Sequence, residues 1–228
     1  MPLLLTNDDG LGADGLLALE KAASGFGPLR VIAPKEALSG CGHRVTTHAP
    51  IWWEPGPHDH HHALVGTPAD CVRIALHEWG RDWDWVLSGI NAGGNLGADV
   101  PISGTIAAAR EAAYHGIRAA SFSHYKKREL DFDWDRAASW VVRVMGWLDQ
   151  NETPPGSFWN VNFPHLSKNE SEPEIIRATV GRHPLPLDFR KGEKGWIYSG
   201  NYHERGRDPG SDVAICFEGN IAVSLLSV

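Results

Sequence analysis

Short, continuous apolar runs alternate with longer amphipathic stretches over most of the chain. Five runs have the length and apolar character of buried strands: Leu3–Thr6, Leu29–Pro34, Trp83–Leu87, Arg118–Phe122 and Phe158–Phe163. Between them lie four stretches with helical spacing: Leu16–Ala23, Pro68–Trp79, Thr105–His115 and 134–149. A strand, a helix and a second strand in succession form a right-handed parallel crossover. The pattern therefore predicts an α/β fold with a Rossmann-like, doubly wound, mostly parallel sheet.

The first departure from this alternation lies between residues 44 and 65. Prolines there separate three short β-prone runs: Arg44–Thr47, Ile51–Trp53 and His61–Val65. Such runs predict an inserted antiparallel β-ribbon. The cluster His58–His62 resembles a transition-metal site, but it follows a Pro-Gly-Pro turn, so we expect an exposed hairpin tip.

The second departure begins near residue 174, where Gly, Pro, Arg and Trp become frequent. The runs Val213–Phe217 and Ile221–Leu226 flank Glu218-Gly219-Asn220, which is typical of a hairpin. We expect a single domain over residues 1–228. Its core would span about 1–165, and its β-rich C-terminal extension of about 174–228 would serve oligomerisation.

Composition and charge narrow the class of protein. A chain of 228 residues with 42% apolar and 21% charged residues has the make-up of a globular domain, not of a disordered or fibrous chain. The net charge is −7 and no basic block is present, so we expect no duplex nucleic acid as partner. The apolar runs are too short for a bilayer, and the opening residues lack the basic region of a signal peptide. We therefore expect no membrane partner.

Cysteine usage adds an expectation about location. The chain has three cysteines, Cys41, Cys71 and Cys216, without C-x-x-C spacing. An odd count without this spacing is typical of neither a disulfide framework nor a zinc site, and it indicates a reducing, cytoplasmic setting.

Candidate chemistry gathers in loops that follow the predicted strands. Asp8 and Asp9 come directly after the first strand. Adjacent carboxylates repel each other, and a hard divalent cation (Mg²⁺, Mn²⁺ or Ca²⁺) would compensate them. The alternative is an Asp-Gly turn that caps a helix. Because ligands of open parallel sheets bind beyond the carboxyl ends of strands, the position favours the metal.

Two further loops carry short polar side chains among glycines. Ser39 could add a neutral oxygen ligand, although for this segment alone an ordinary loop is the better interpretation. Asn91 offers an amide oxygen, and Asn95 offers an amide donor. Ser103-Gly104-Thr105 opens an alanine-rich helix, where a serine cap and free N–H groups can bind an anion such as phosphate.

Two nucleotide-binding patterns do not fit well. Gly10, Gly12 and Gly15 have dinucleotide-fingerprint spacing, but Asp8 and Asp9 would place negative charge beside the pyrophosphate. No G-x-x-x-x-G-K-[ST] motif is present, which excludes P-loop chemistry.

Together these segments resemble the SurE family of stationary-phase survival proteins. The matching segments keep the family's order: Leu5–Gly10, Ala33–Pro34, Ser39–Gly40, Gly42–His43, Gly66–Val72, Ser88–Asn91, Ser103–Thr105 and Asn160–Pro164. The resemblance implies a metal-dependent nucleotidase with a Rossmann-like core. It also implies a swapped C-terminal extension in a homodimer or homotetramer.

The resemblance implies roles for single residues as well. The family's ligands to one divalent metal ion, Mg²⁺ or Mn²⁺, match Asp8, Asp9, Ser39 and Asn91. Its phosphate contacts match Asn95, Ser103, Gly104 and Thr105. This chain departs from the family at Ile102, where many members carry an aromatic residue, and at Leu38 beside the proposed site.

The expected function is hydrolysis of nucleoside 5′-monophosphates, and of 3′-monophosphates, with Asp8 or Asp9 orienting or deprotonating the attacking water. Two alternatives stay open at this point. One is a phosphatase for another phosphorylated metabolite or short polyphosphate. The other is a nucleotide-binding module without hydrolysis, in which the carboxylate pair would be a disadvantage.

Overall fold

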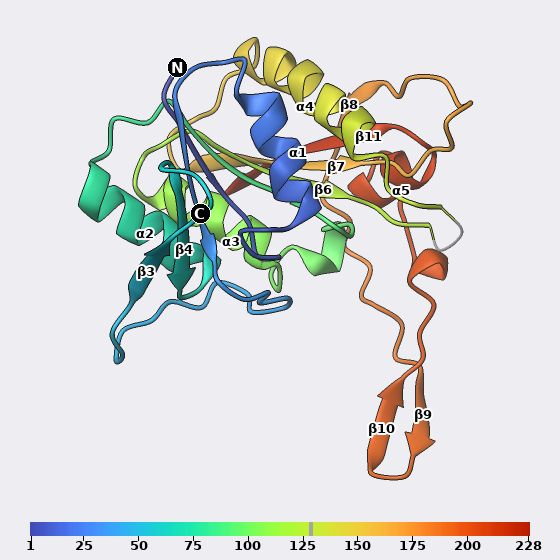
Figure 1. Ribbon diagram of the computed structural model, residues 1–228. Helices are drawn as coiled ribbons and strands as arrows, with labels where there is room; N and C mark the ends of the chain where they lie inside the picture. The colour runs from blue at the N-terminus through green and yellow to red at the C-terminus, as the bar shows by residue number, and fades with distance from the viewer. Residues whose placement is uncertain (128–129) are drawn as a thin grey trace.

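The computed structural model of the protein describes residues 1–127 and 130–228. Within these residues one sheet has nine strands in the order β3-β4-β2-β1-β5-β6-β7-β11-β8 (Figure 1). Their bounds are β1 Leu3–Thr6, β2 Leu29–Pro34, β3 Trp52–Pro55, β4 His61–Val65, β5 Trp85–Asn91, β6 Ala119–His124, β7 Ser157–Phe163, β8 Ile175–Arg177 and β11 Ile221–Ser227. The centre, from β4 to β7, is parallel throughout.

The first strand marks the point where the strand order reverses. β1 pairs with β2 on one side and with β5 on the other. The chain first builds the β2 and β4 side and then returns past β1 to build β5, β6 and β7. The predicted doubly wound sheet is confirmed, and the loop after β1 lies at its switch point, where ligands of such folds bind.

Two helices cover each face of the sheet (Figure 1). α1 (Asp14–Ala23) and α4 (Trp134–Asp149) share one apolar core, and α2 (Pro68–Trp79) and α3 (Gly104–Tyr114) share the other. Local signals begin these helices: Thr67 and Asp70 form a capping box for α2, and Asp133 caps α4. Each fully buried leucine, valine or isoleucine of these cores contributes about 1.5–3 kcal/mol.

The inserted ribbon is shorter than the sequence predicts. β3 and β4 pair antiparallel, as expected, but the run Arg44–Thr47 forms no strand. The amide and hydroxyl of Thr46 donate instead to the carboxylate of Asp70, at 2.9 and 2.7 Å. These bonds hold the run against the start of α2. β4 also pairs in parallel with β2, so the ribbon extends the main sheet.

The prediction of a hairpin over residues 213–226 is wrong. Asp212–Phe217 forms helix α5, because the side chain of Ser211 caps its first turn by accepting from the amide of Ala214 at 3.2 Å. β11 then enters the main sheet between β7 and β8. The C-terminal hairpin lies earlier, formed by β9 (Phe189–Gly192) and β10 (Gly195–Tyr198).

The β9–β10 hairpin projects from the body as an arm (Figure 1). A short 3₁₀ turn, η2 (Tyr202–Glu204), follows the arm in the chain. A second one, η1 (Gly97–Asp99), contacts it, since the hydroxyl of Tyr202 donates to the carboxylate of Asp99. In the part of the chain that the structure describes, no helix combines the length and the apolar character needed to cross a membrane.

Candidate functional site

The loop after β1 carries two acidic side chains in a fixed turn. The side chain of Asn7 donates to the carbonyl of Gly10 at 2.9 Å and accepts from its amide at 3.1 Å, which closes the turn around Asp8 and Asp9. Asp8 is 4% exposed, and Asp9 is more open to solvent. The turn thus holds one carboxylate inside the protein and one at its edge.

Asp8 contacts the beginning of α3. The hydroxyl of Thr105 donates a hydrogen bond to Oδ1 of Asp8. A Cβ atom on Gly104 would lie 2.9 Å from the Cβ of Asp8 and 2.9 Å from Sγ of Cys41, so only glycine fits there. Gly104 therefore gives the buried carboxylate its place against the helix.

Asp9 faces the loop that follows β5. Its Oδ2 accepts a hydrogen bond from the backbone amide of Ala92 at 3.3 Å. In the same loop, Nδ2 of Asn91 donates to the carbonyl of Gly93 at 2.8 Å. This bond orients the amide group and leaves its oxygen, the atom a hard cation prefers, available to a ligand.

Ser39 lies in an exposed loop whose backbone forms hydrogen bonds with the loop after β1 and with the segment before α3. The amide of Leu38 donates to the carbonyl of Asp8 at 2.8 Å, and the amide of Gly42 donates to the carbonyl of Ile102 at 3.0 Å. Within the described residues, the hydroxyl of Ser39 has no hydrogen bond to either carboxylate. The fold therefore places Ser39 beside the pair without engaging it.

The electrostatics of this turn leave negative charge without a protein countercharge. Burial raises the pKa of Asp8 to about 6; the Thr105 hydroxyl lowers it, and the charge of Asp9 raises it. Burial also raises the pKa of Asp9. No lysine, arginine or histidine forms an ion pair with either carboxylate among the described residues. Two carboxylates and an amide oxygen, without a protein cation, fit a hard divalent cation.

The beginning of α3 supplies hydrogen-bond donors next to the pair. Oγ of Ser103 accepts from the amide of Ile106 at 3.1 Å, as expected for a cap. The remaining first-turn amides and the helix dipole favour an anion, and Gly104 and Thr105 lie directly against Asp8. The geometry therefore places a helix end that favours an anion beside a carboxylate pair that favours a cation.

Asn95 is buried and already has several hydrogen bonds. Its Nδ2 donates to Oγ of Ser123 at 2.8 Å, and its backbone amide donates to Oδ1 of Asn162 at 2.8 Å. Its backbone carbonyl accepts hydrogen bonds from the side-chain Nδ2 atoms of Asn160 and Asn162. The structure thus shows Asn95 fixing the loop after β5 to strands β6 and β7, and its contact with phosphate stays a prediction.

Sequence reasoning missed a cluster around Glu111. Its two carboxylate oxygens form hydrogen bonds with His43 at 2.7 Å and His115 at 3.1 Å. Burial raises the pKa of Glu111, and the bonds with both histidines lower it, with a net value below the ordinary one. His115 follows at i+4 on the same helix, but His43 is 68 residues away, so spacing could not reveal this contact.

A cavity of about 310 Å³ opens beside the loop after β5. Its lining residues are Gly93, Gly94, Tyr125, Lys126, Tyr202 and His203. The last two come from the C-terminal region, which sequence reasoning assigned to oligomerisation only. A larger cavity of about 630 Å³, between residues 130–135 and 166–168, contains none of the predicted site residues.

Comparison with known proteins identifies the family. The model of the survival protein SurE family matches residues 3–183. A protein of Nostoc sp. is 49% identical over the full length of both chains. Proteins named 5′-nucleotidase SurE from Geotalea uraniireducens and Moorella thermoacetica are 38% and 33% identical, over 99% of this chain and 92% and 90% of theirs.

The fold leads to the same family. The crystal structure of the SurE protein from Aquifex aeolicus matches with a TM-score of 0.85 at 28% identity, over 100% of this chain and 93% of that chain. The resemblance predicted from the ordered motifs is confirmed by the sequence and by the fold. The chain belongs to the SurE family.

Proposed function

We propose that this protein is a 5′-nucleotidase, a metal-dependent phosphomonoesterase that hydrolyses nucleoside 5′-monophosphates and accepts 3′-monophosphates. The observation that carries the proposal is the pair of carboxylates beside the beginning of α3, Asp8 buried and Asp9 at the edge of the protein, without a protein countercharge. Full-length relatives named 5′-nucleotidase support the same activity.

One divalent cation, Mg²⁺ or Mn²⁺, would be held by Asp8, Asp9, Asn91 and Ser39. When bound, it supplies a positive charge for a phosphoryl oxygen and lowers the pKa of a water molecule. Asp8 is oriented by Thr105, and the amide of Asn91 is oriented by Gly93, so two of the four ligands are fixed in advance. Ser39 lies in an exposed loop whose backbone is bonded to Asp8 through Leu38, and its hydroxyl would be the fourth ligand.

The protein's own groups bind and orient the phosphate. The first-turn amides of α3 and the hydroxyl of Ser103 would stabilise the equatorial oxygens of the phosphoryl group as charge spreads over them. The single hydroxyl proton of Thr105 is donated to Asp8, so Thr105 would act on the phosphate through that carboxylate. Gly104 holds the end of the helix against Asp8, where the phosphate would bind, and Asn95 keeps the neighbouring loop in place. Asp9 is the more exposed carboxylate, and it would orient the attacking water and receive its proton.

The nucleoside would lie in the 310 Å³ cavity beside this loop. Tyr125 and Tyr202 have nearly parallel rings, with centroids 6.4 Å apart, and His203 forms a hydrogen bond to the hydroxyl of Tyr125. Such aromatic walls suit a planar base. Lys126 adds a positive charge at the rim. This chain has Ile102 where many family members carry an aromatic residue. The aromatic side chains of this cavity would contact the base instead.

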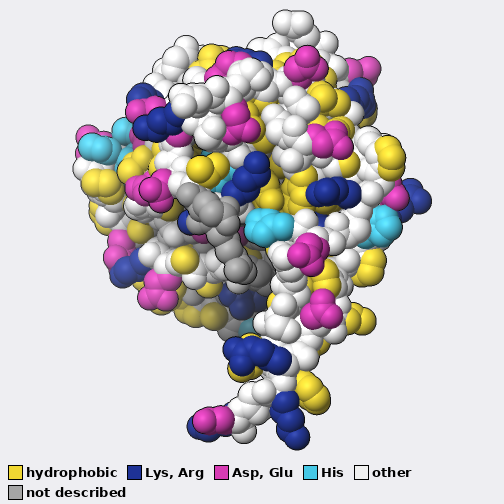
Figure 2. Space-filling view, turned by 90° about the vertical axis from the view of Figure 1, so that its right-hand side faces the viewer, with side chains coloured by type: hydrophobic (Ala, Val, Ile, Leu, Met, Phe, Trp, Pro, Cys, Tyr) yellow, Lys and Arg dark blue, Asp and Glu magenta, His cyan; other side chains and the backbone are white. Residues whose placement is uncertain are grey.

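We also propose that the protein acts as a homodimer or homotetramer in the cytoplasm. The β9–β10 arm stands clear of the body and carries lysine and arginine side chains (Figure 2). It also exposes large apolar side chains, among them Trp196 at 72% and Phe189 at 51%. An arm with this much exposed apolar surface is typical of an interaction site. Light scattering of a Trp196→Ser, Phe189→Ser variant, compared with the native chain, tests the assembly.

The activity is tested by phosphate release from nucleoside 5′- and 3′-monophosphates, sugar phosphates and short polyphosphate, with Mg²⁺, Mn²⁺ or EDTA. We expect metal-dependent release, with the highest kcat/KM for a nucleoside 5′-monophosphate. Faster release from a sugar phosphate or polyphosphate would replace the nucleotide as substrate. Nucleotide binding without release from any compound would show a binding module instead of a hydrolase.

A further inference from the structure

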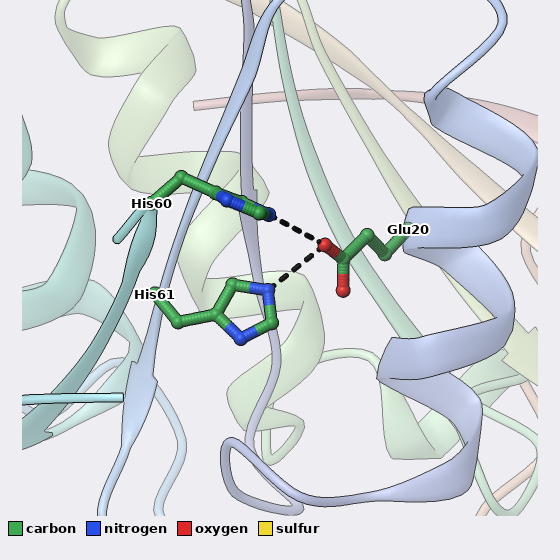
Figure 3. A group of neighbouring side chains, drawn as sticks. All are labelled: Glu20, His60 and His61. Carbon is green, nitrogen blue, oxygen red and sulfur yellow. Dashed lines mark hydrogen bonds and ion pairs between the residues drawn. The ribbon is translucent and has the colours of Figure 1, made fainter. Parts of the chain in front are cut away.

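A second cluster of metal-binding side chains lies away from the proposed nucleotidase site. Glu20 projects from α1, and His60 and His61 lie at the beginning of β4 (Figure 3). Nε2 of each histidine is 2.8 Å from the same oxygen, Oε1 of Glu20. The three potential ligand atoms all lie within 4.8 Å of one another. The expectation of an exposed hairpin tip is wrong for His61, which is 3% exposed.

The backbone holds the two histidines in place. The carbonyl of His60 accepts from the amide of Val31 in β2 at 2.9 Å, and the amide of His61 donates to the carbonyl of His58 at 2.9 Å. A Cβ atom on Gly56 would lie 2.5 Å from the Cβ of His61, so a glycine is required for the turn to close. The rings therefore point at Glu20 from a fixed strand end, as a preorganised site requires.

Glu20 and the two histidines are paired with one another. Within the described residues, the ion pairs of Glu20 are those with His60 and His61 alone. Nδ1 of His61 is buried and has no hydrogen-bond partner among them, so Nε2 is the only atom through which this ring can act.

We propose that Glu20, His60 and His61 form a binding site for a zinc ion. Two imidazole nitrogens and one carboxylate oxygen are a set of three protein ligands that zinc takes, with water in the fourth position. Two ligand atoms that each lie about 2.0–2.1 Å from a tetrahedral zinc ion are about 3.3 Å from each other. Each Nε2 is 2.8 Å from Oε1, so each N–O distance has to lengthen by only a few tenths of an ångström. Both rings contact the same carboxylate oxygen, and no bond from either ring to Oε2 of Glu20 is drawn (Figure 3).

The donor set separates this ion from the one proposed at Asp8 and Asp9. Imidazole nitrogen favours zinc and related transition metals, whereas carboxylate and amide oxygens favour Mg²⁺ or Mn²⁺. A zinc ion here would join α1 to the β3–β4 ribbon, two elements that otherwise meet through these hydrogen bonds at this point. Its effect is therefore on stability, and it does not depend on the proposed nucleotidase activity.

The test measures zinc binding to the full chain without a histidine tag, by equilibrium dialysis in an excess of Mg²⁺ that occupies the oxygen site. We expect one zinc ion per chain, and a visible absorption band of tetrahedral geometry when Co²⁺ replaces it. Glu20→Gln keeps the shape of the side chain, and His60→Ala changes a half-exposed one; each should weaken zinc binding about tenfold or more. Zinc at a hundred times its dissociation constant should raise the Tm of the native chain by about 5–10 °C.

Two controls separate this site from others. His77→Ala removes an exposed histidine of α2 and should leave zinc binding unchanged. Far-UV circular dichroism of each variant checks the fold. The proposal is overturned if Glu20→Gln and His60→Ala, both folded, bind zinc as the native chain does. It is also overturned if Asp9→Asn abolishes zinc binding while Glu20→Gln preserves it, or if no zinc binds at all.

Discussion

Two clusters that contain carboxylates lie near α1, one in the loop before it and one near its end. They differ in whether the protein supplies a group that stabilises the charged carboxylate. Before the helix, Asp8 and Asp9 have no protein cation, and burial raises the pKa of both. Near its end, Glu20 has two histidines, and its pKa falls below the ordinary value. The first cluster needs an external cation to be ionised at low cost, whereas the second is already compensated. The difference fits the two proposals, a metal-dependent reaction at the first cluster and a stabilising zinc ion at the second.

The largest expected effect tests which cluster supports hydrolysis. Asp8→Asn and Asp9→Asn should each lower metal-dependent phosphate release about 10²–10³-fold, because the ligand charge is lost while the shape is kept. Glu20→Gln should change the rate less than about twofold. Initial rates with a nucleoside 5′-monophosphate measure both.

Asp14→Asn is the matched control, since Asp14 is an exposed acid in the first turn of α1. The comparison between the clusters fails if Glu20→Gln loses as much activity as Asp8→Asn, or if Asp8→Asn retains full metal-dependent turnover.

The second effect is on pH-dependent stability without metal. The pKa of Asp8 is about 6 in the folded state and 3.8 ordinarily, so the folded state binds more protons between these values. The stability of the metal-free protein should therefore fall by about 2–3 kcal/mol as the pH rises from 4 to 6, and Asp8→Asn should remove this loss. Urea denaturation in EDTA across this range measures it.

Glu20 should show the opposite sign. Its folded pKa is lowered, so its contribution is present above its ordinary pKa and is lost as the pH falls through the lower folded value. The stability of Glu20→Gln relative to the native chain should therefore decline as the pH rises through about 4.5. Parallel pH profiles for the two variants would contradict the contrast between the clusters.

A smaller effect concerns the group that orients Asp8. Thr105→Val keeps the size of the side chain but removes the hydroxyl that donates to Oδ1. We expect kcat/KM to fall about tenfold, because a hydrogen bond to a charged group contributes about 1.5–3 kcal/mol and metal binding recovers part of it. Thr105→Ser should keep most of the activity. If valine and serine behave alike, the hydroxyl has no role in positioning.

The smallest expected effect tests whether the cavity beside the carboxylates binds the nucleoside rather than the phosphate. Lys126→Ala should raise KM for nucleoside monophosphates about three- to tenfold and leave kcat unchanged, because Lys126 lines the cavity proposed for the nucleoside. A sugar phosphate without a base should show no change. An equal loss with both substrates would place Lys126 at the phosphate instead of the nucleoside.

Much of the core could be predicted because local signals and burial agree there. α2 and α4 were predicted with their observed bounds, since Thr67 and Asp133 cap them and each helix has one apolar side. The contact of Asp9 with the loop after β5 also followed from the sheet, because the carboxyl ends of β1 and β5 are neighbours.

The rest depended on contacts between distant segments. Val213 and Ile215 favour a strand by propensity, but the cap at Ser211 and the burial of both side chains make a helix. His61 follows a turn whose composition is typical of the surface, and only the approach of α1 buries it against Glu20. Local propensity does not include contacts with distant segments, so the assignments of residues 213–217 as a strand and of His61 as exposed were both wrong for the same reason.

The position of β11 has a consequence for how the protein is made. This strand is translated after every other strand of the sheet, yet it lies between β7 and β8 and pairs with β7 over six residues. Until it emerges from the ribosome, the backbone of β7 on that side has no partner, and the nascent chain exposes an open strand edge. A chaperone that shields such an edge during synthesis would therefore have its greatest effect between the emergence of β7 and that of β11.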